Sequence, residues 1–270
     1  MSLRQYRPRG TQRRGLSTTR NRILWSLIAL SLLLQILYPL VHGGLLRGLT
    51  LAIVYVSAAA VSAHALYSYG TRYFFTYIFI TGAYAFIVEE IGVKSGWPFG
   101  NYHYDSTLGI AIAGVPLVVP FAWMMLAHPL LIAARRVAHG WVFLYGGIAL
   151  MSWDLFLDPQ MVAAHRWIWK SAKPAIPLEP MIPLSNAAGW LFAGMGLMAL
   201  LNVLLPKGRL KVGAGHAAAD LILMWTFFSG VVGNLFFFHR AGTALLGGIF
   251  FGAVIAPYFF SLRFGRPDYL

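Results

Sequence analysis

The sequence predicts an all-α membrane protein, a bundle of about eight transmembrane helices with both termini in the cytoplasm. Of its 270 residues, 59% are hydrophobic and only 11% are charged, whereas soluble domains carry about 25% charged residues. One soluble core of this size cannot enclose so much apolar surface, so lipid must solvate most of the chain. The chain has no cysteine, which excludes disulfides, thiolate metal sites and a cysteine nucleophile.

Residues 1–22 form a basic N-terminal tail that we expect to be disordered, and residues 23–270 form the membrane domain. Seven arginines stand in this tail among Pro, Gly and Ser, with little apolar content to drive folding. A basic tail before an apolar segment is more typical of membrane topology and contact with anionic lipid headgroups than of nucleic-acid binding. The apolar segment Ile23–Val41 is too long for a cleavable signal peptide.

Eight stretches approach the roughly 20 apolar residues that a helix needs to span the hydrocarbon core. In chain order they are Ile23–Val41, Leu49–Tyr69, Tyr73–Gly92, Pro116–Ala134, Gly140–Asp158, Asn186–Leu205, Ala217–Phe238 and Gly242–Leu262. The third and the fifth are the weakest, because each reaches spanning length only by including carboxyl groups near one end. The two longest connections, Val93–Val115 and Pro159–Ser185, are rich in Trp, Tyr and Pro, so we expect them to be ordered. Glu179 is flanked by prolines in the second of these connections, and we expect its side chain to be solvated.

The distribution of positive charge predicts the orientation of the bundle in the membrane. With the N-terminus inside, fifteen Lys and Arg residues lie in cytoplasmic segments and six lie in outer segments. An even number of helices returns the C-terminus to the cytoplasm. We therefore expect a multi-pass protein of the cell (plasma) membrane in which Asn101 and Lys170 face outward.

Asp154 and Asp158 carry carboxyl groups into the fifth predicted helix, where such groups are costly and usually functional. A spacing of four residues places both side chains on one face of the helix. Pro159 follows directly and is expected to end the helix. The alternative is a structural role, with the two acids paired to Arg166 or Lys170.

Glu89 and Glu90 lie near the end of the third predicted helix. Adjacent residues of a helix point about 100° apart, so the two side chains cannot share a face. Glu90 has Lys94 four residues later, in the favourable order for a surface ion pair. Glu89 has no such local partner and is therefore the better functional candidate.

The loop after these glutamates is dense in aromatic and polar side chains, which are Trp97, Phe99, Asn101, Tyr102, His103 and Tyr104. Tyr and Trp often anchor a protein at the membrane interface without a further role. Clustered aromatic rings with polar tips can also orient one end of a substrate or stabilise a cation through their π faces. We keep both interpretations of this loop.

The metal-ligating residue types do not form a recognisable site in the sequence. The eight histidines are scattered, with no two within five residues, unlike the clustered ligands of di-iron oxygenases. The pair Asp154 and Asp158 is similar to one half of the acid-rich motifs that hold Mg²⁺ in membrane prenyltransferases, but only Glu89 and Glu90 could supply the other half. We therefore expect no metal site and no cofactor.

Three segments of the chain resemble the carotenoid biosynthesis membrane proteins, a family that includes hydratases of gamma-carotene and bisanhydrobacterioruberin. They are Glu89–Tyr104, Trp153–Pro159 and Ile182–Trp190, and their order and spacing fit the family across roughly Tyr73–Trp190. In the family pattern an acid stands three residues before a glycine, a position that falls on Glu89.

The resemblance implies a hydratase that adds water to the terminal 1′,2′ double bond of an acyclic carotenoid end group by acid catalysis. Such a reaction needs a protonated carboxylic acid, stabilisation of a tertiary cation, and water. The expected general acid is Asp154, with Asp158 and Glu89 orienting water or stabilising the cation. The expected substrate-binding residues are Trp97, Phe99, Asn101, Tyr102, His103, Tyr104, Trp153 and Asn186.

Two other functions fit the same residues. A Mg²⁺-dependent prenyl or lipid transferase would lose its activity in a chelator. A non-catalytic carrier for carotenoids or polyprenyl lipids would bind pigment without turnover. The choice of carboxyl group as the acid and the oligomeric state stay open at this point.

Overall fold

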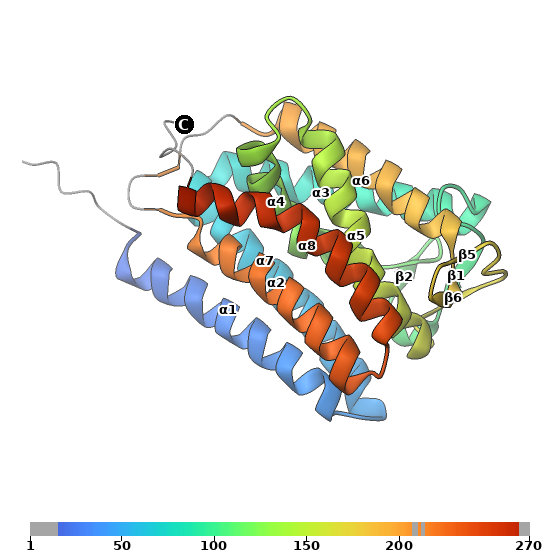
Figure 1. Ribbon diagram of the computed structural model, residues 1–270. Coiled ribbons are helices and arrows are strands. Elements are labelled where there is room, and N and C mark those ends of the chain that lie inside the picture. Colours follow the sequence, from blue (N-terminus) through green and yellow to red (C-terminus); the bar gives the residue numbers. More distant parts are fainter. Residues whose placement is uncertain (1–15, 207–209, 212–213, 265–270) are drawn as a thin grey trace, which may run out of the picture.

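The computed structural model describes residues 16–206, 210, 211 and 214–264, and these residues form an up-and-down bundle of eight long α-helices (Figure 1). The helices are α1 (Thr18–Leu37), α2 (Gly44–Tyr69), α3 (Thr71–Ser95), α4 (Val118–Val137), α5 (Val142–Ala163), α6 (Leu184–Leu204), α7 (Ala217–Val232) and α8 (Ala241–Phe264). Among the described residues, seven of these helices are long and apolar enough to cross a membrane. The remaining helix is α5, which carries both Asp154 and Asp158. The chain is therefore a multi-pass membrane protein, as the sequence predicted.

Several helix boundaries differ from the sequence prediction, and two of them concern the predicted tail and Pro159. Helix α1 begins before Ile23 because Ser17 caps it, accepting a hydrogen bond from the Arg20 backbone N–H at 3.4 Å. Residues 18–22 of the predicted tail are thus helical, and residues 1–15 lie outside the described residues. The prediction that Pro159 ends its helix is wrong, since α5 continues to Ala163. A proline removes one backbone hydrogen bond, a loss that neighbouring elements compensate in membrane helices.

The two long connections are ordered, as predicted, and they pair with each other. Strand β1 (Tyr102–Tyr104) of the first connection lies antiparallel to β4 (Trp167–Trp169) of the second. Tyr102 is opposite Trp169, and Tyr104 is opposite Trp167. Two short hairpins complete this region, formed by β2 (Ala111–Ile112) with β3 (Val115–Pro116) and by β5 (Ala175–Ile176) with β6 (Glu179–Pro183).

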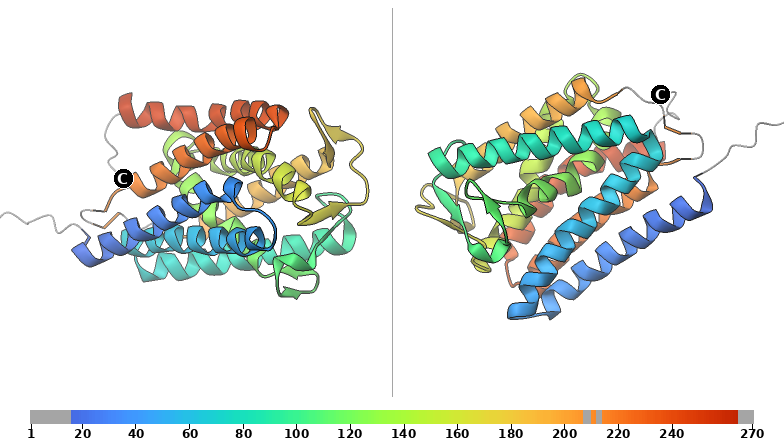
Figure 2. Two further views of the ribbon diagram at one scale, coloured as in Figure 1. Left: turned by 90° about the horizontal axis from the view of Figure 1, so that it is seen from below. Right: turned by 180° about the vertical axis from the view of Figure 1, so that it is seen from behind.

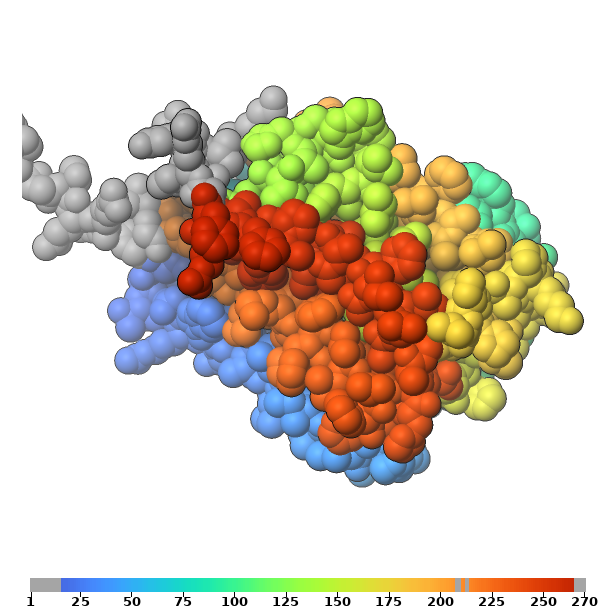
Figure 3. Space-filling model, in the orientation of Figure 1, coloured from blue at the N-terminus to red at the C-terminus, as the bar shows by residue number. Residues whose placement is uncertain are grey.

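The strands lie at one end of the bundle, and the start of α1 and the end of α8 lie at the other end (Figures 1 and 2). Helix α4 is enclosed by its neighbours, and α3 and α8 lie on opposite faces of the molecule. Figure 3 shows the β4–β6 segment (yellow) packed against the start of α8. If the N-terminus is cytoplasmic, as the charge distribution predicts, the strands face outward.

Candidate functional site

Glu89 lies in α3 with its carboxyl group buried and hydrogen-bonded to three side chains. Its Oε2 accepts hydrogen bonds from the hydroxyl groups of Tyr102 at 2.6 Å and Tyr104 at 2.8 Å. Its Oε1 accepts from Nε1 of Trp123 in α4 at 3.1 Å. Burial, followed by the charge of Glu89, raises the pKa of both tyrosines, so their hydroxyl groups stay protonated and act as donors.

The β1–β4 pairing explains why both tyrosines reach Glu89. Successive side chains of a strand point to opposite faces, so Tyr102 and Tyr104 share the face toward the helices while His103 lies exposed between them. Gly92 in α3 provides the space, because a Cβ there would lie 2.7 Å from the Tyr102 hydroxyl group. Gly189 in α6 does the same for the ring of Phe99, which would lie 2.6 Å from its Cβ.

Asp154 and Asp158 form the second acidic group, and both are buried in α5. One amide nitrogen joins them, since Asn186 Nδ2 donates to Asp154 Oδ2 at 2.8 Å and also to Asp158 Oδ2. The other oxygen of Asp158 accepts from Nε1 of Trp167 at 2.9 Å, whereas Asp154 Oδ1 has no hydrogen-bond partner. Arg166 donates to Thr107 instead, so the predicted alternative of pairing with Arg166 is wrong.

A cavity of about 80 Å³ lies where these groups meet, and we call it the carboxyl cavity. Glu89, Asp158 and Asn186 line it together with the rings of Phe99, Tyr102, Tyr104, Trp123, Trp167, Trp169 and Trp190. The volume suffices for several water molecules, each of which needs about 10–15 Å³ in the same measure. The rings of Trp123 and Trp190 are stacked, with centroids 4.5 Å apart. The cavity thus combines carboxyl groups with aromatic faces and with room for water.

The structure brings together most of the residues that the sequence singled out. Glu89, Asp158, Phe99, Tyr102, Tyr104 and Asn186 line the carboxyl cavity. Asp154 contacts Asn186 without lining the cavity. Trp153 packs edge-to-face on Trp190, with centroids 5.8 Å apart, and lines a neighbouring cavity between α1, α2 and α7.

Three further residues predicted to bind substrate line neither of these two cavities. Trp97 is 67% exposed, and Asn101 is also exposed, with its backbone carbonyl accepting from Lys170 N–H. His103 occupies the outward face of β1. The period of two along this strand separates His103 from its neighbours, which the interpretation of the segment as an irregular loop did not anticipate.

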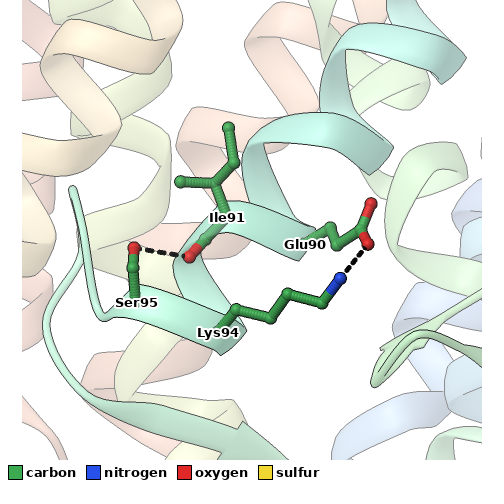
Figure 4. Close-up of polar contacts among 4 residues, drawn as sticks. All are labelled: Glu90, Ile91, Lys94 and Ser95. Atoms are coloured by element: carbon green, nitrogen blue, oxygen red, sulfur yellow. Dashed lines mark hydrogen bonds and ion pairs between the residues drawn. The ribbon is translucent and has the colours of Figure 1, made fainter.

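Two other acidic residues have structural partners. Glu90 pairs with Lys94 on the surface of α3, as predicted, in the same helical turn as the hydrogen bond that Ser95 donates to the Ile91 carbonyl (Figure 4). The expectation of a solvated Glu179 is wrong. The β5–β6 hairpin buries this side chain against α8, where it accepts from Thr243 and lies 3.6 Å from Arg240.

The histidines of the described residues do not enter the carboxyl cavity. His64 and His128 contact each other at 3.0 Å between ring nitrogens, and Tyr73 contacts His128. This pair lies toward the other end of the bundle, where His64 also contacts the Gly215 carbonyl. In the part of the chain that the structure describes, no three His, Asp or Glu side chains are grouped to hold a metal ion.

Four tryptophans of the cavity wall were not selected from the sequence. Trp167 and Trp169 flank Ile168, an alternation that is typical of a strand with one buried face and could have identified them. Trp190 belongs to a segment that carried the family resemblance. Trp123 lies in an apolar helix, and nothing in its neighbourhood marks it as a partner of a carboxyl group.

Comparisons with known proteins point to carotenoid metabolism. Residues 49–255 match the family described as "Carotenoid biosynthesis protein". Over 126 residues the chain is 36% identical to the bisanhydrobacterioruberin hydratase of Haloarcula japonica, an alignment that covers 44% of this chain and 41% of that protein. The chain thus spans less than half the length of this curated relative. No solved structure matches the chain.

Proposed function

The chain belongs to the carotenoid biosynthesis protein family, and we propose that it adds water to the terminal 1′,2′ double bond of an acyclic carotenoid. The family match covers residues 49–255 and implies a carotenoid substrate. The hydratase among its relatives, at 36% identity, supports hydration as the reaction. The proposal also places the protein in the plasma membrane, with its basic tail near anionic lipid headgroups.

The observation that carries the proposal is an aromatic cavity at one end of a membrane bundle that is lined by two buried carboxyl groups, Glu89 and Asp158. A third buried carboxyl group, Asp154, is joined to Asp158 through Asn186. Alkene hydration needs a proton donor, a site that tolerates a carbocation, and water. A neutral carboxylic acid can supply the proton, and burial away from cations favours that neutral form. The π faces of Trp and Tyr and a nearby carboxylate stabilise positive charge.

The hydrogen bonds divide the roles among the three acids. Glu89 accepts hydrogen bonds from three donors, which fix the orientation of its carboxyl group, so we assign it the stabilisation of the cation and the positioning of water. Asp154 and Asp158 share one amide group and have few other donors, so this pair holds the proton. Asp158 faces the cavity and delivers the proton, while Asp154 supports it from behind the wall.

The reaction then proceeds in two steps. The carboxylic acid of Asp158 protonates the secondary carbon of the terminal double bond, leaving a tertiary cation and a carboxylate. A water molecule adds to the cation through its oxygen and returns one proton to the acidic pair, which restores the starting state. The product is a tertiary alcohol, and no electrons are exchanged with a cofactor.

The position of the cavity fits a substrate with a long apolar body. A carotenoid is about as long as the hydrocarbon core is thick, roughly 30 Å. Its body can remain among the helices while one end reaches the strand-capped end of the bundle, where water is available.

Expression of the chain in a host that accumulates an acyclic carotenoid tests the proposal. Mass analysis of the extracted pigments is expected to show the gain of one water per modified end group. The matched control is the double variant Asp154→Asn and Asp158→Asn, which keeps the shape of both side chains and is expected to leave the pigment unchanged. Pigment that never gains water in the presence of the folded wild-type protein would refute the hydratase assignment.

A further inference from the structure

A second, larger cavity adjoins the carboxyl cavity. Its volume is about 310 Å³, and it lies between α1, α2 and α7, with α4 and α5 at its base. We call it the outer cavity. Five residues line both cavities and form a neck between them, namely Thr50, Val54, Ala122, Leu157 and Met161.

The outer cavity opens toward lipid on the side of α1 and α7. Ile36 of α1, Phe228 of α7 and Phe237 of the turn after α7 (η3, Gly233–Phe237) lie on its wall and are each half exposed or more. An apolar molecule dissolved in the bilayer can therefore enter here without crossing water. The exposed side chains named here are apolar, so this opening does not favour the entry of polar molecules from water.

The walls of the outer cavity suit a flat, rigid and apolar occupant. Trp153, Phe156, Trp225 and Phe228 present aromatic rings to it. The polar side chain of Gln35 is occupied by its neighbours, since it accepts from Nε1 of Trp225 at 3.1 Å and its own amide donates to Ser31 at 3.1 Å. Aromatic walls pack closely against conjugated chains and contribute a large buried area.

From this geometry we infer that the outer cavity binds the polyene body of the substrate, and that the neck passes only its terminal isopropylidene group into the carboxyl cavity. The inference rests on the proposed function for the identity of the substrate. It assigns an acyclic polyene, rather than a membrane lipid, to the outer cavity because the cavity leads directly to the carboxyl groups. Only an occupant with a reactive end makes use of that connection.

Two substitutions on α7 separate the outer cavity from the lipid-facing surface. Ser229 lines the cavity and is half buried, so Ser229→Trp fills part of the space. Met224 is 55% exposed on the same helix and does not line the cavity, so Met224→Trp places the same indole side chain on the lipid-facing surface. If Ser229→Trp fails to fold, Thr226→Phe on the same wall takes its place with the same expectations.

Lycopene, an acyclic C40 polyene, serves as the long probe, and 2-methyl-2-butene serves as a short probe that carries only the reacting end. Binding of lycopene to the protein in lipid nanodiscs is followed by its induced circular dichroism in the visible range, independently of turnover. Ser229→Trp is expected to weaken lycopene binding by at least about tenfold, because the displaced chain loses buried contact area. Hydration of the short probe is expected to stay within about twofold of wild type, since the carboxyl cavity is intact.

The outcomes distinguish the two proposals. Lycopene that binds Ser229→Trp as tightly as wild type and Met224→Trp would overturn the placement of the polyene, and the outer cavity would then hold lipid chains only. A different result would separate the two proposals: lycopene binds wild type and binds Ser229→Trp more weakly, but wild type hydrates neither probe. This result would support the placement of the polyene and refute the hydratase activity. Equal loss of lycopene binding in both variants would also overturn the placement.

Discussion

Replacing Asp158 by asparagine removes the carboxyl group that faces the carboxyl cavity while keeping the shape of the side chain. If Asp158 delivers the proton, turnover is expected to fall by about 10²–10⁴, the usual contribution of general acid catalysis. At about 1.36 kcal/mol per tenfold change, this corresponds to roughly 3–5 kcal/mol of lost transition-state stabilisation. Asp154→Asn is expected to lower turnover by at least about 10² as well, because the two acids act as a pair.

The hydrogen bonds around Asp158 set the expected cost in stability. The new amide can still accept from Nε1 of Trp167 with its oxygen, which turns its NH₂ group toward Nδ2 of Asn186. Two donors then face each other, at a cost of about 1–3 kcal/mol. A domain with 5–15 kcal/mol of stability tolerates this loss, so the variant is expected to fold.

The assay is the initial rate of lycopene hydration in nanodiscs, with thermal unfolding measured on the same samples. Glu90→Gln is the control, because Glu90 pairs with Lys94 at the surface (Figure 4), where an ion pair contributes about 0–1 kcal/mol. Its rate is expected to stay within about twofold of wild type. A folded Asp158→Asn protein with a rate within about threefold of wild type would refute the role of Asp158 as general acid.

Three further predictions concern Glu89, metal and topology. Glu89→Gln should unfold within about 1 kcal/mol of wild type because tyrosine hydroxyl groups can accept from the new amide, whereas Glu89→Ala should unfold earlier; both should lose about 10²–10³ in rate, and an active Glu89→Ala would contradict the assignment. Turnover in EDTA should match turnover without it, and a loss restored by Mg²⁺ would favour the transferase alternative. An impermeant maleimide should label Asn101→Cys and Lys170→Cys in intact cells but not Arg72→Cys, and the reverse pattern would invert the topology.

The helices could be predicted from the sequence because the length of an apolar stretch alone defines a membrane span. The acidic site residues could be identified for a related reason, since carboxyl groups are rare and costly in apolar segments. The side chains that donate hydrogen bonds to these acids were harder to predict. Trp123 comes from another helix, and its contact with Glu89 depends on tertiary packing that no local pattern encodes. The alternation around Ile168 predicts that Trp167 is on a buried face, but it does not predict which acid Trp167 contacts. Glu179 was misjudged because its partners, Thr243 and Arg240, lie more than sixty residues later in the chain.

The sharing of Asn186 between Asp154 and Asp158 has a consequence for how the protein is made. Helix α5 is not among the described helices that are long and apolar enough to cross a membrane, and an aspartate opposes insertion by up to about 2.5–3.5 kcal/mol, the cost at a helix centre. The group that satisfies both acids arrives only with α6, the next helix to leave the ribosome. We therefore expect α5 to enter the bilayer together with α6 as one helical hairpin. The two aspartates would then be hydrogen-bonded to the side-chain amide of Asn186 when they enter the hydrocarbon core.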